Sequence, residues 1–301
     1  MFNLIKMNLY SVVRTVSFWV MIAVTAVVAV FCVKMTAVDL QHMEDNQYAV
    51  EQQTDIEDAQ GLTISYNDEG NTENADDNEA IGITFDSDEK WVNGDIDFDM
   101  LMMGMFRGGM IALIASIFIA IYTNAEQKTG YIKNIAGQLP QRGMLSLAKL
   151  VGIAAELLIM FAVFIVACVI CGKIVFEGRF VFNNIGGALK VIALQYLLHV
   201  AFGSIVMMLC TIARGSGIGM TVGIFYCSNM TSLIYTGINF VLNKLGIEKF
   251  DISKYDLMGY IMSANVGADS DTLTKCAIAG VIYIAVCTAV SMVIMQKRDI
   301  K

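Results

Sequence analysis

Six long stretches of the chain are apolar and carry at most one charged residue each. An α-helix needs about 20 mostly apolar residues to cross a hydrocarbon core of about 30 Å. We therefore predict six transmembrane helices, at residues 18–38, 100–124, 150–172, 191–213, 215–243 and 276–296. The pattern indicates an all-α integral membrane protein.

Residues 1–17 show a different pattern, with apolar side chains near helical spacing and Lys6 and Arg14 between them. An amphipathic helix of this kind can lie in the plane of the membrane interface ahead of the first span. A simple helical extension of the first span fits the periodicity equally well.

Residues 39–99 form a polar insert between the first two predicted spans. Two short alternating stretches, 62–66 and 81–85, have the pattern of β-strands. They could pair as a hairpin-like cap on either side of an acidic centre. Two strands alone are marginal in water, so such a cap would need a third strand or a partner.

Composition excludes an ordinary soluble domain, because 56% of the residues are hydrophobic and only 16% are charged. A soluble chain has about 25% charged residues. Charge is also unevenly distributed: residues 39–99 hold 19 of the 28 acidic residues and a single basic residue, Lys90. The net charge of −8 therefore hides a basic remainder.

If the spans alternate, most basic residues of that remainder fall on one side of the membrane. They are Lys6, Arg14, Lys128, Lys133, Arg142, Lys149, Arg214, Lys297, Arg298 and Lys301. Positive charge gathers on the cytoplasmic side of membrane proteins. We expect a multi-pass protein of the cell membrane with both termini in the cytoplasm. The acidic insert and the loop at 244–275 would then be extracellular.

The longest cytoplasmic loop, residues 125–149, has its own pattern. Ile132, Ile135, Ala136 and Leu139 share one helical face, and Pro140, the only proline of the chain, ends that helix. A short amphipathic helix on the cytoplasmic face suits docking onto a soluble partner.

At this loop the chain resembles the permease subunits of bacterial ATP-binding-cassette (ABC) transporters of the type-2 export class. In that family an acidic residue follows span two, a glycine comes four residues later, and Pro-x-Arg precedes span three. Glu126, Gly130, Pro140 and Arg142 match this pattern in order. The amphipathic start, the large first outer loop and the six spans are similar as well.

The resemblance implies that the loop helix, which contains Lys133, is a coupling helix seated on a cytoplasmic ABC ATPase. It also implies a second permease, either another copy or a homologue. ATP and Mg would bind the ATPase subunits, with no cofactor on this chain. The cargo would be a hydrophobic or amphipathic molecule such as a peptide or drug, and nothing predicts binding to nucleic acid.

The sequence contains no Gly-x-x-x-x-Gly-Lys-[Ser/Thr] phosphate loop, so we expect ATP hydrolysis on another chain and no enzyme activity here. All seven cysteines lie in or beside the predicted spans. Cys168 and Cys171 have the spacing of a redox or metal pair, but no second pair or histidine accompanies them. Small buried apolar residues are the favoured interpretation, and no metal site is predicted.

Apart from Lys34, which follows the apolar run of the first span, three ionisable residues lie within predicted spans. A charge there costs about 2.5–3.5 kcal/mol at mid-helix and marks a functional candidate. The three residues are Arg107, Glu156 and His199. Arg107 can instead extend to the lipid headgroups, Glu156 can pair with Lys149 or face another helix, and His199 can be a hydrogen-bonded packing residue.

The fifth predicted span combines two patterns along one helix. Gly215, Gly219 and Gly223 form a small-residue face in its inner half, which lets helix backbones approach closely. Its outer half carries a polar stripe of Ser228, Ser232, Tyr235 and Asn239. The stripe suits a translocation pathway or a seam between two permeases, whereas ordinary helix packing accounts for it too.

Two other classes compete with a permease. A membrane scaffold, or a sensor whose extracellular cap binds a ligand, would need neither an ATPase nor the 126–142 loop. An intramembrane enzyme would need paired catalytic groups, whereas Glu156 and His199 lie far apart in the sequence.

Overall fold

The computed structural model describes residues 2–60, 94–128, 142–228, 230–244 and 255–297. These residues contain ten α-helices: α1 (Phe2–Arg14), α2 (Val16–Gln60), α3 (Phe98–Arg107), α4 (Met110–Lys128), α6 (Met144–Val175), α7 (Ile185–Ala213), α8 (Ser216–Cys227), α9 (Thr231–Lys244), α10 (Leu257–Ser263) and α11 (Ser270–Lys297). They also contain a 3-10 turn, η2 (Glu177–Arg179), and two short strands, β1 (Ile96–Asp97) and β2 (Phe180–Val181).

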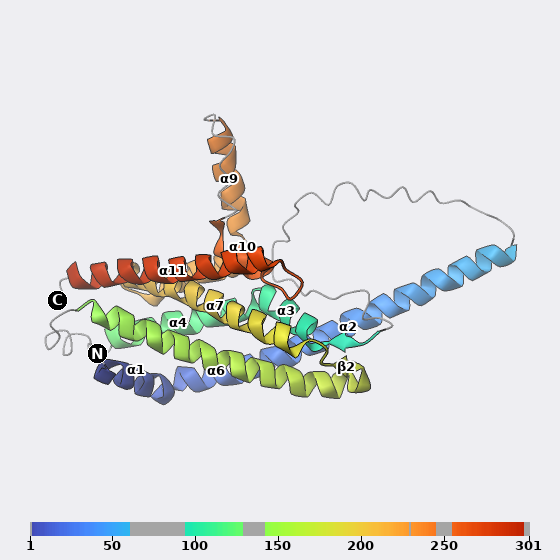
Figure 1. Ribbon diagram of the computed structural model, residues 1–301, viewed down its shortest axis with the longest axis horizontal. Helices are drawn as coiled ribbons and strands as arrows, with labels where there is room; N and C mark the ends of the chain where they lie inside the picture. The colour runs from blue at the N-terminus through green and yellow to red at the C-terminus, as the bar shows by residue number, and fades with distance from the viewer. Residues whose placement is uncertain (1, 61–93, 129–141, 229, 245–254, 298–301) are drawn as a thin grey trace.

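Helices α2, α4, α6, α7 and α11 run along the long axis of the molecule (Figure 1). Helices α6, α7 and α11, and α2 over Val16–Glu44, are each long and apolar enough to cross a membrane. Helices α3 and α4 pass the same test together as a bent pair, which gives four candidate spans, or five, in the described part of the chain. The predicted class is therefore confirmed as a multi-pass helical membrane protein, although six spans are not all present as single helices.

Helix α7 is the central helix of the bundle. In the most apolar 18-residue stretch of each helix, the buried share is 61% for α7, 39% for α6, 33% for α2 and 28% for α11. It packs against α4, α6, α8 and α11. The outer helices expose apolar side chains such as Val27, Ile174 and Val281, as expected of surfaces that face lipid.

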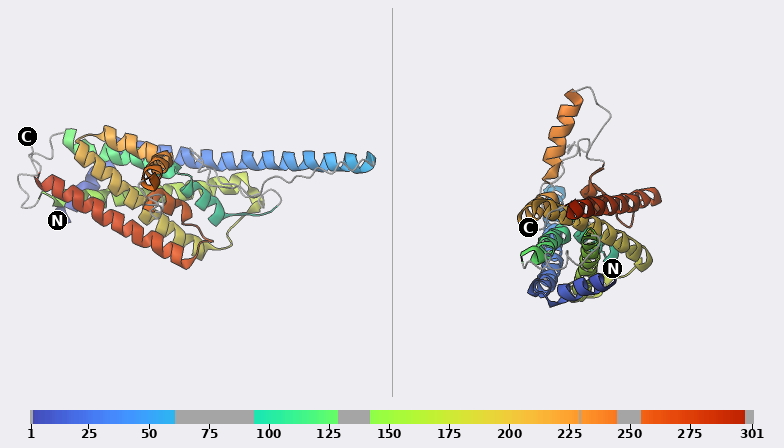
Figure 2. Two further views of the ribbon diagram at one scale, coloured as in Figure 1. Left: turned by 90° about the horizontal axis from the view of Figure 1, so that it is seen from above. Right: turned by 90° about the vertical axis from the view of Figure 1, so that its left-hand side faces the viewer.

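Helix α1 is a helix of its own, so residues 1–17 do not extend the first span as one uninterrupted helix. The helical conformation is interrupted at Thr15. The hydroxyl of this residue donates to the main-chain oxygens of Ser11 and Val12, each at 2.8 Å. The Thr15 main-chain N–H donates to the same two oxygens, each at 3.2 Å, so its side chain and its backbone together satisfy the carbonyls at the end of α1. Helix α1 packs against the side of α6, near the end of the bundle where the N-terminus lies (Figures 1 and 2).

Helix α2 continues past the predicted end of the first span. It runs for 45 residues, about 67 Å at the α-helical rise, and extends out of the bundle (Figures 1 and 2). The first part of the predicted insert is thus helical, because residues 39–60 contain no glycine or proline and many good helix formers. The expected strands at 62–66 and 81–85 lie outside the described residues.

The strands that the structure does contain are elsewhere. Strand β1 pairs in parallel with β2, with Ile96 opposite Phe180 and Asp97 opposite Val181. The Arg179 guanidinium donates hydrogen bonds to the main-chain oxygen of Gly94, at 3.1 Å from Nε and 3.0 Å from Nη2. This contact ties the segment that enters α3 to the connection between α6 and α7.

The predicted span at 100–124 is bent by 49° between α3 and α4. Gly109 lies at the bend with φ +74°, a left-handed conformation that glycine adopts without steric cost. A Cβ at this position would lie 2.7 Å from the main-chain oxygen of Cys227. The absence of a side chain therefore permits both the bend and the close approach of α8.

The predicted span at 215–243 is not one helix. Helix α8 ends at Cys227, and α9 points away from the bundle, across its long axis (Figure 1). Ser228 lies at the break and its hydroxyl donates to the main-chain oxygen of Ile224 at 2.9 Å. Ser, Asn and Thr side chains compete with helical hydrogen bonds, which explains a break in this polar stretch.

Candidate functional site

Several elements meet at one end of the bundle. Helix α4 ends there, α6 begins, α7 turns into α8, and both described termini lie at the same end (Figures 1 and 2). Basic residues mark these element ends: Lys128, Arg142, Arg214 and Lys297. We refer to this region as the basic end.

Lys149 holds two of these helices together. It lies in the second turn of α6, is only 4% exposed, and donates a hydrogen bond of 2.9 Å from Nζ to the main-chain oxygen of Thr123 in α4. A buried ammonium group is costly unless its hydrogen bonds are made. Thr123 lies one turn before the end of α4, so the contact positions the two helices that flank residues 129–141.

Helix α1 joins the same assembly through a buried polar contact. The Tyr122 hydroxyl of α4 donates to Asn8 Oδ1 of α1 at 3.3 Å. On α6, Gly152 leaves the space that this hydroxyl occupies, because a Cβ there would collide with it. The small residue and the tyrosine therefore bring α1, α4 and α6 together.

Helix α11 meets α6 where α6 begins. A Cβ at Gly143 would lie 3.2 Å from the main-chain oxygen of Met292, so this glycine permits a close approach. Of the predicted coupling residues, Arg142 is half-buried beside this contact, and Glu126 belongs to α4. Gly130, Lys133 and Pro140 lie outside the described residues.

The three intramembrane ionisable residues do not form one site. Arg107, at the end of α3, donates a hydrogen bond from Nε to the main-chain oxygen of Met262. Glu156 is buried, and no ion pair joins it to Lys149 in the described residues; its Oε2 has no hydrogen-bond partner there. The proposed pairing within α6 is therefore wrong, because Lys149 is directed to Thr123.

His199 lies in an aromatic cluster at the centre of α7. Its Nδ1 lies 2.7 Å from the main-chain oxygen of Gln195, which can only accept, so Nδ1 carries the proton. The Phe161 ring packs edge-on against the imidazole at 5.1 Å between centroids, and Phe106 at 6.3 Å. These contacts match the packing interpretation of His199.

Gln195 is a residue that the sequence analysis missed. Its amide Nε2 donates to the main-chain oxygens of Ile261 at 2.8 Å and Ala264 at 2.9 Å, which fixes the end of α10 on α7. The available signal was its position four residues before His199, on the same helical face of the uncharged run 191–213.

The glycine face and the polar stripe of the fifth predicted span are separated by the break between α8 and α9. A Cβ at Gly219 would collide with Cys210 Sγ of α7, and one at Gly223 would lie 2.6 Å from Ser116 Cβ of α4. Gly215 has only the main-chain oxygen of Ala213 nearby, at 4.0 Å. The close packing is therefore between helices of one chain.

The polar stripe does not line a single helix face. Ser228 directly follows α8, and Tyr235 and Asn239 belong to α9, while the side chain of Ser232 lies outside the described part. Tyr235 donates to Asp256 Oδ1 at 3.0 Å, and the Tyr226 hydroxyl of α8 donates to the same atom. Asp256 thus joins α8 and α9 to the start of α10.

The cysteines behave as small buried residues. All seven are free and buried. Cys168 lies near Met105, with 3.6 Å between the sulfur atoms. No group of three or more His, Cys, Asp or Glu side chains in the described residues is arranged to hold a metal ion.

The fold and these contacts define a multi-pass helical membrane protein whose buried polar groups connect helices. A family model described as "Protein of unknown function (DUF2705)" matches residues 90–301, more than half of the chain, and the chain belongs to this family. No curated protein and no solved structure matches the chain.

Proposed function

We propose that this chain is the permease subunit of a transporter, paired with a second permease and driven by separate cytoplasmic ABC ATPases. ATP and Mg would bind the ATPases, and this chain would hydrolyse nothing. The cargo would be a hydrophobic or amphipathic molecule such as a peptide or drug. The proposal combines the loop sequence from Glu126 to Arg142 with the architecture of the basic end.

The observation that carries the proposal is the tie between α4 and α6. Residues 129–141 leave one of these helices and enter the other, and Lys149 joins both helices close to those points. A partner that moved this segment would act on two candidate spans at once. Helix α11 contacts Gly143 at the start of α6, so it would move together with α6.

We also propose six passages through the membrane, with the basic end in the cytoplasm. The start of α1 and the end of α11 lie at the same end of the bundle, which supports an even number of passages (Figure 1). Helix α8 has 12 residues and spans about 18 Å, too short for a core of about 30 Å. Helix α8 can therefore make only part of the fifth passage.

Purification of the tagged chain from its own membranes in mild detergent tests the proposal. We expect an ATPase to co-purify, and Glu126→Ala or Arg142→Ala to reduce its recovery or to uncouple its ATP hydrolysis from transport. Asp95→Ala and Lys190→Ala are matched controls, because both residues are exposed and lie near the starts of β1 and α7, at the opposite end of the bundle. A chain that purifies without any ATPase would instead support a scaffold or a sensor.

A further inference from the structure

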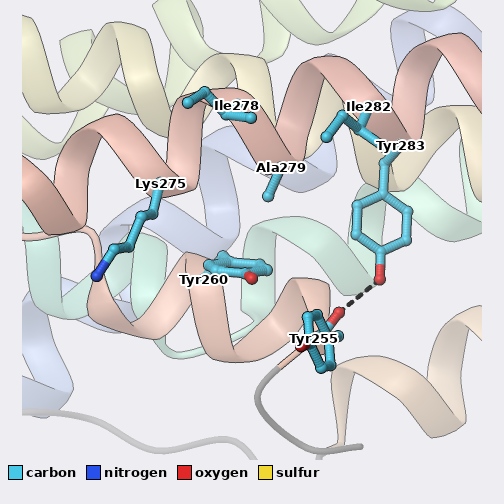
Figure 3. A pocket seen from close by; sticks show the side chains of 7 residues that line it. All are labelled: Tyr255, Tyr260, Lys275, Ile278, Ala279, Ile282 and Tyr283. Carbon is cyan, nitrogen blue, oxygen red and sulfur yellow. Dashed lines mark hydrogen bonds between the residues drawn. The ribbon is translucent and has the colours of Figure 1, made fainter.

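A groove of about 390 Å³ lies between α11 and the segment around α10. Its lining is formed by Tyr255, Tyr260, Lys275, Ile278, Ala279, Ile282 and Tyr283 (Figure 3). Lys275 lies at one end and the Tyr283 side chain at the other, with Tyr260 between them below Ala279 (Figure 3). The groove is thus polar at one end and apolar along its α11 wall.

The groove lies at a defined depth relative to the bilayer. Lys275 is the last charged residue before the uncharged run from Cys276 to Gln296. A lysine at this boundary reaches the level of the lipid headgroups. The apolar wall from Ile278 to Ile282 follows within the hydrocarbon, and Ile282 lies about 10 Å from Lys275 along the helix.

Two polar side chains of the groove, Lys275 and Tyr260, can donate hydrogen bonds to a ligand. Lys275 is exposed and makes no hydrogen bond or ion pair with any described residue, although Asp271 lies one turn before it. The Tyr260 hydroxyl also makes no hydrogen bond within the described part. The Tyr283 hydroxyl, by contrast, donates to the main-chain oxygen of Tyr255 at 2.6 Å and closes the far end (Figure 3).

The apolar wall of the groove is short and narrow. Three apolar side chains of α11, Ile278, Ala279 and Ile282, form this wall. A single extended hydrocarbon chain can lie along it, within the depth of the hydrocarbon core. The cation at the headgroup level adds a preference for negative charge.

We propose that this groove binds an anionic phospholipid, with one acyl chain along α11 and the phosphate beside Lys275 and Tyr260. Binding requires neither an ATPase nor transport, so this inference stands apart from the proposed function. It predicts that the protein retains phosphatidylglycerol in preference to phosphatidylcholine with identical acyl chains.

Native mass spectrometry of the purified full chain, with each lipid added separately, measures this preference. Lys275→Gln should weaken phosphatidylglycerol binding about fivefold, since a lysine near the surface contributes about 1 kcal/mol with anionic lipid, and should leave phosphatidylcholine unchanged. Ala279→Phe should weaken both lipids alike because it fills the groove. Ile282→Ser makes the apolar wall polar and should also weaken the binding of both lipids. This second variant tests the proposal if Ala279→Phe does not fold.

Two matched controls fix the position of the lipid. Lys190→Gln changes an exposed lysine on α7, and Ala285→Phe adds a ring to an exposed position of α11 outside the groove. Neither should alter binding. Equal effects of Lys275→Gln and Lys190→Gln, or full lipid binding by both Ala279→Phe and Ile282→Ser, would overturn the proposal. Displacement of the lipid by inorganic phosphate would overturn it too, since it would indicate a phosphate site.

Discussion

Lys149 of α6 and Thr123 of α4 are joined by a buried hydrogen bond of 2.9 Å, from the lysine ammonium to the threonine main-chain oxygen. The bond connects two candidate spans beside the segment that joins them. It also explains why a charged residue is only 4% exposed at the start of an apolar helix.

The first prediction concerns this bond. Lys149→Met keeps most of the side-chain volume but removes the charge and the donor. We expect the free energy of unfolding to fall by about 1.5–3 kcal/mol, the range for hydrogen bonds that involve a charged group. Thermal or denaturant unfolding in detergent would measure this loss of stability. Lys190→Met, at an exposed position, should change stability by less than about 0.5 kcal/mol. Equal stability of the two variants would contradict the structural role of Lys149.

The second prediction concerns the bend between α3 and α4. Gly109→Ala places a methyl group 2.7 Å from the Cys227 main-chain oxygen and forces a side chain into a left-handed conformation. The conformation alone costs about 1–2 kcal/mol, and the collision adds to it. Gly178→Ala is the control, because nothing lies within 4 Å of its added Cβ. A Gly109→Ala protein with the melting temperature of the parent would show that the bend is relaxed.

The third prediction tests the packing of α8 on α7. Gly219→Ala should lower the unfolding free energy because its methyl group meets Cys210 Sγ. Adding Cys210→Ala removes the sulfur and should restore part of the loss, which a double-mutant cycle would measure as a favourable coupling energy. Gly217→Ala, with open space around it on the same helix, should have little effect. Strictly additive effects at 219 and 210 would place the strain elsewhere.

Most of the long helices could be predicted from the sequence because membrane crossing depends on the length of an uncharged run. Residues 150–172, 191–213 and 276–296 fall within α6, α7 and α11. Hydropathy does not detect a break that involves no charge. Gly109 and Ser228 are both uncharged. A count of apolar residues therefore does not reveal the bend between α3 and α4 or the division of the fifth span.

The candidate site was harder to predict because its contacts join distant parts of the chain. Lys149 was assigned to the cytoplasmic loop by its charge, but its burial depends on Thr123 in another helix. The groove beside Lys275 requires Tyr255 and Tyr260, which come from a segment that the sequence placed in a loop. Local periodicity contains no information on such pairs.

The fourth prediction concerns the anchoring of α10. Gln195→Leu keeps an apolar side chain of similar reach on α7 and removes both hydrogen bonds to α10. We expect a loss of about 1 kcal/mol, since interhelical hydrogen bonds in membranes average about 0.6 kcal/mol each. Gln195→Glu retains acceptors but no amide donor and should cost at least as much. A leucine variant more stable than the parent would mean that the amide is retained for a reason other than stability.

The last prediction concerns orientation, which follows from the basic end and the positive-inside rule. Gly186→Cys, near the start of α7, should react with an impermeant thiol reagent in intact cells. Lys297→Cys, at the end of α11, should react only after the membrane is opened. Both positions are exposed, and a Cβ at Gly186 meets nothing within 4 Å. The seven native cysteines are buried, so the parent protein gives the background directly. Labelling of Lys297→Cys in intact cells would reverse the orientation and place the 129–141 segment outside, where no cytoplasmic ATPase could reach it.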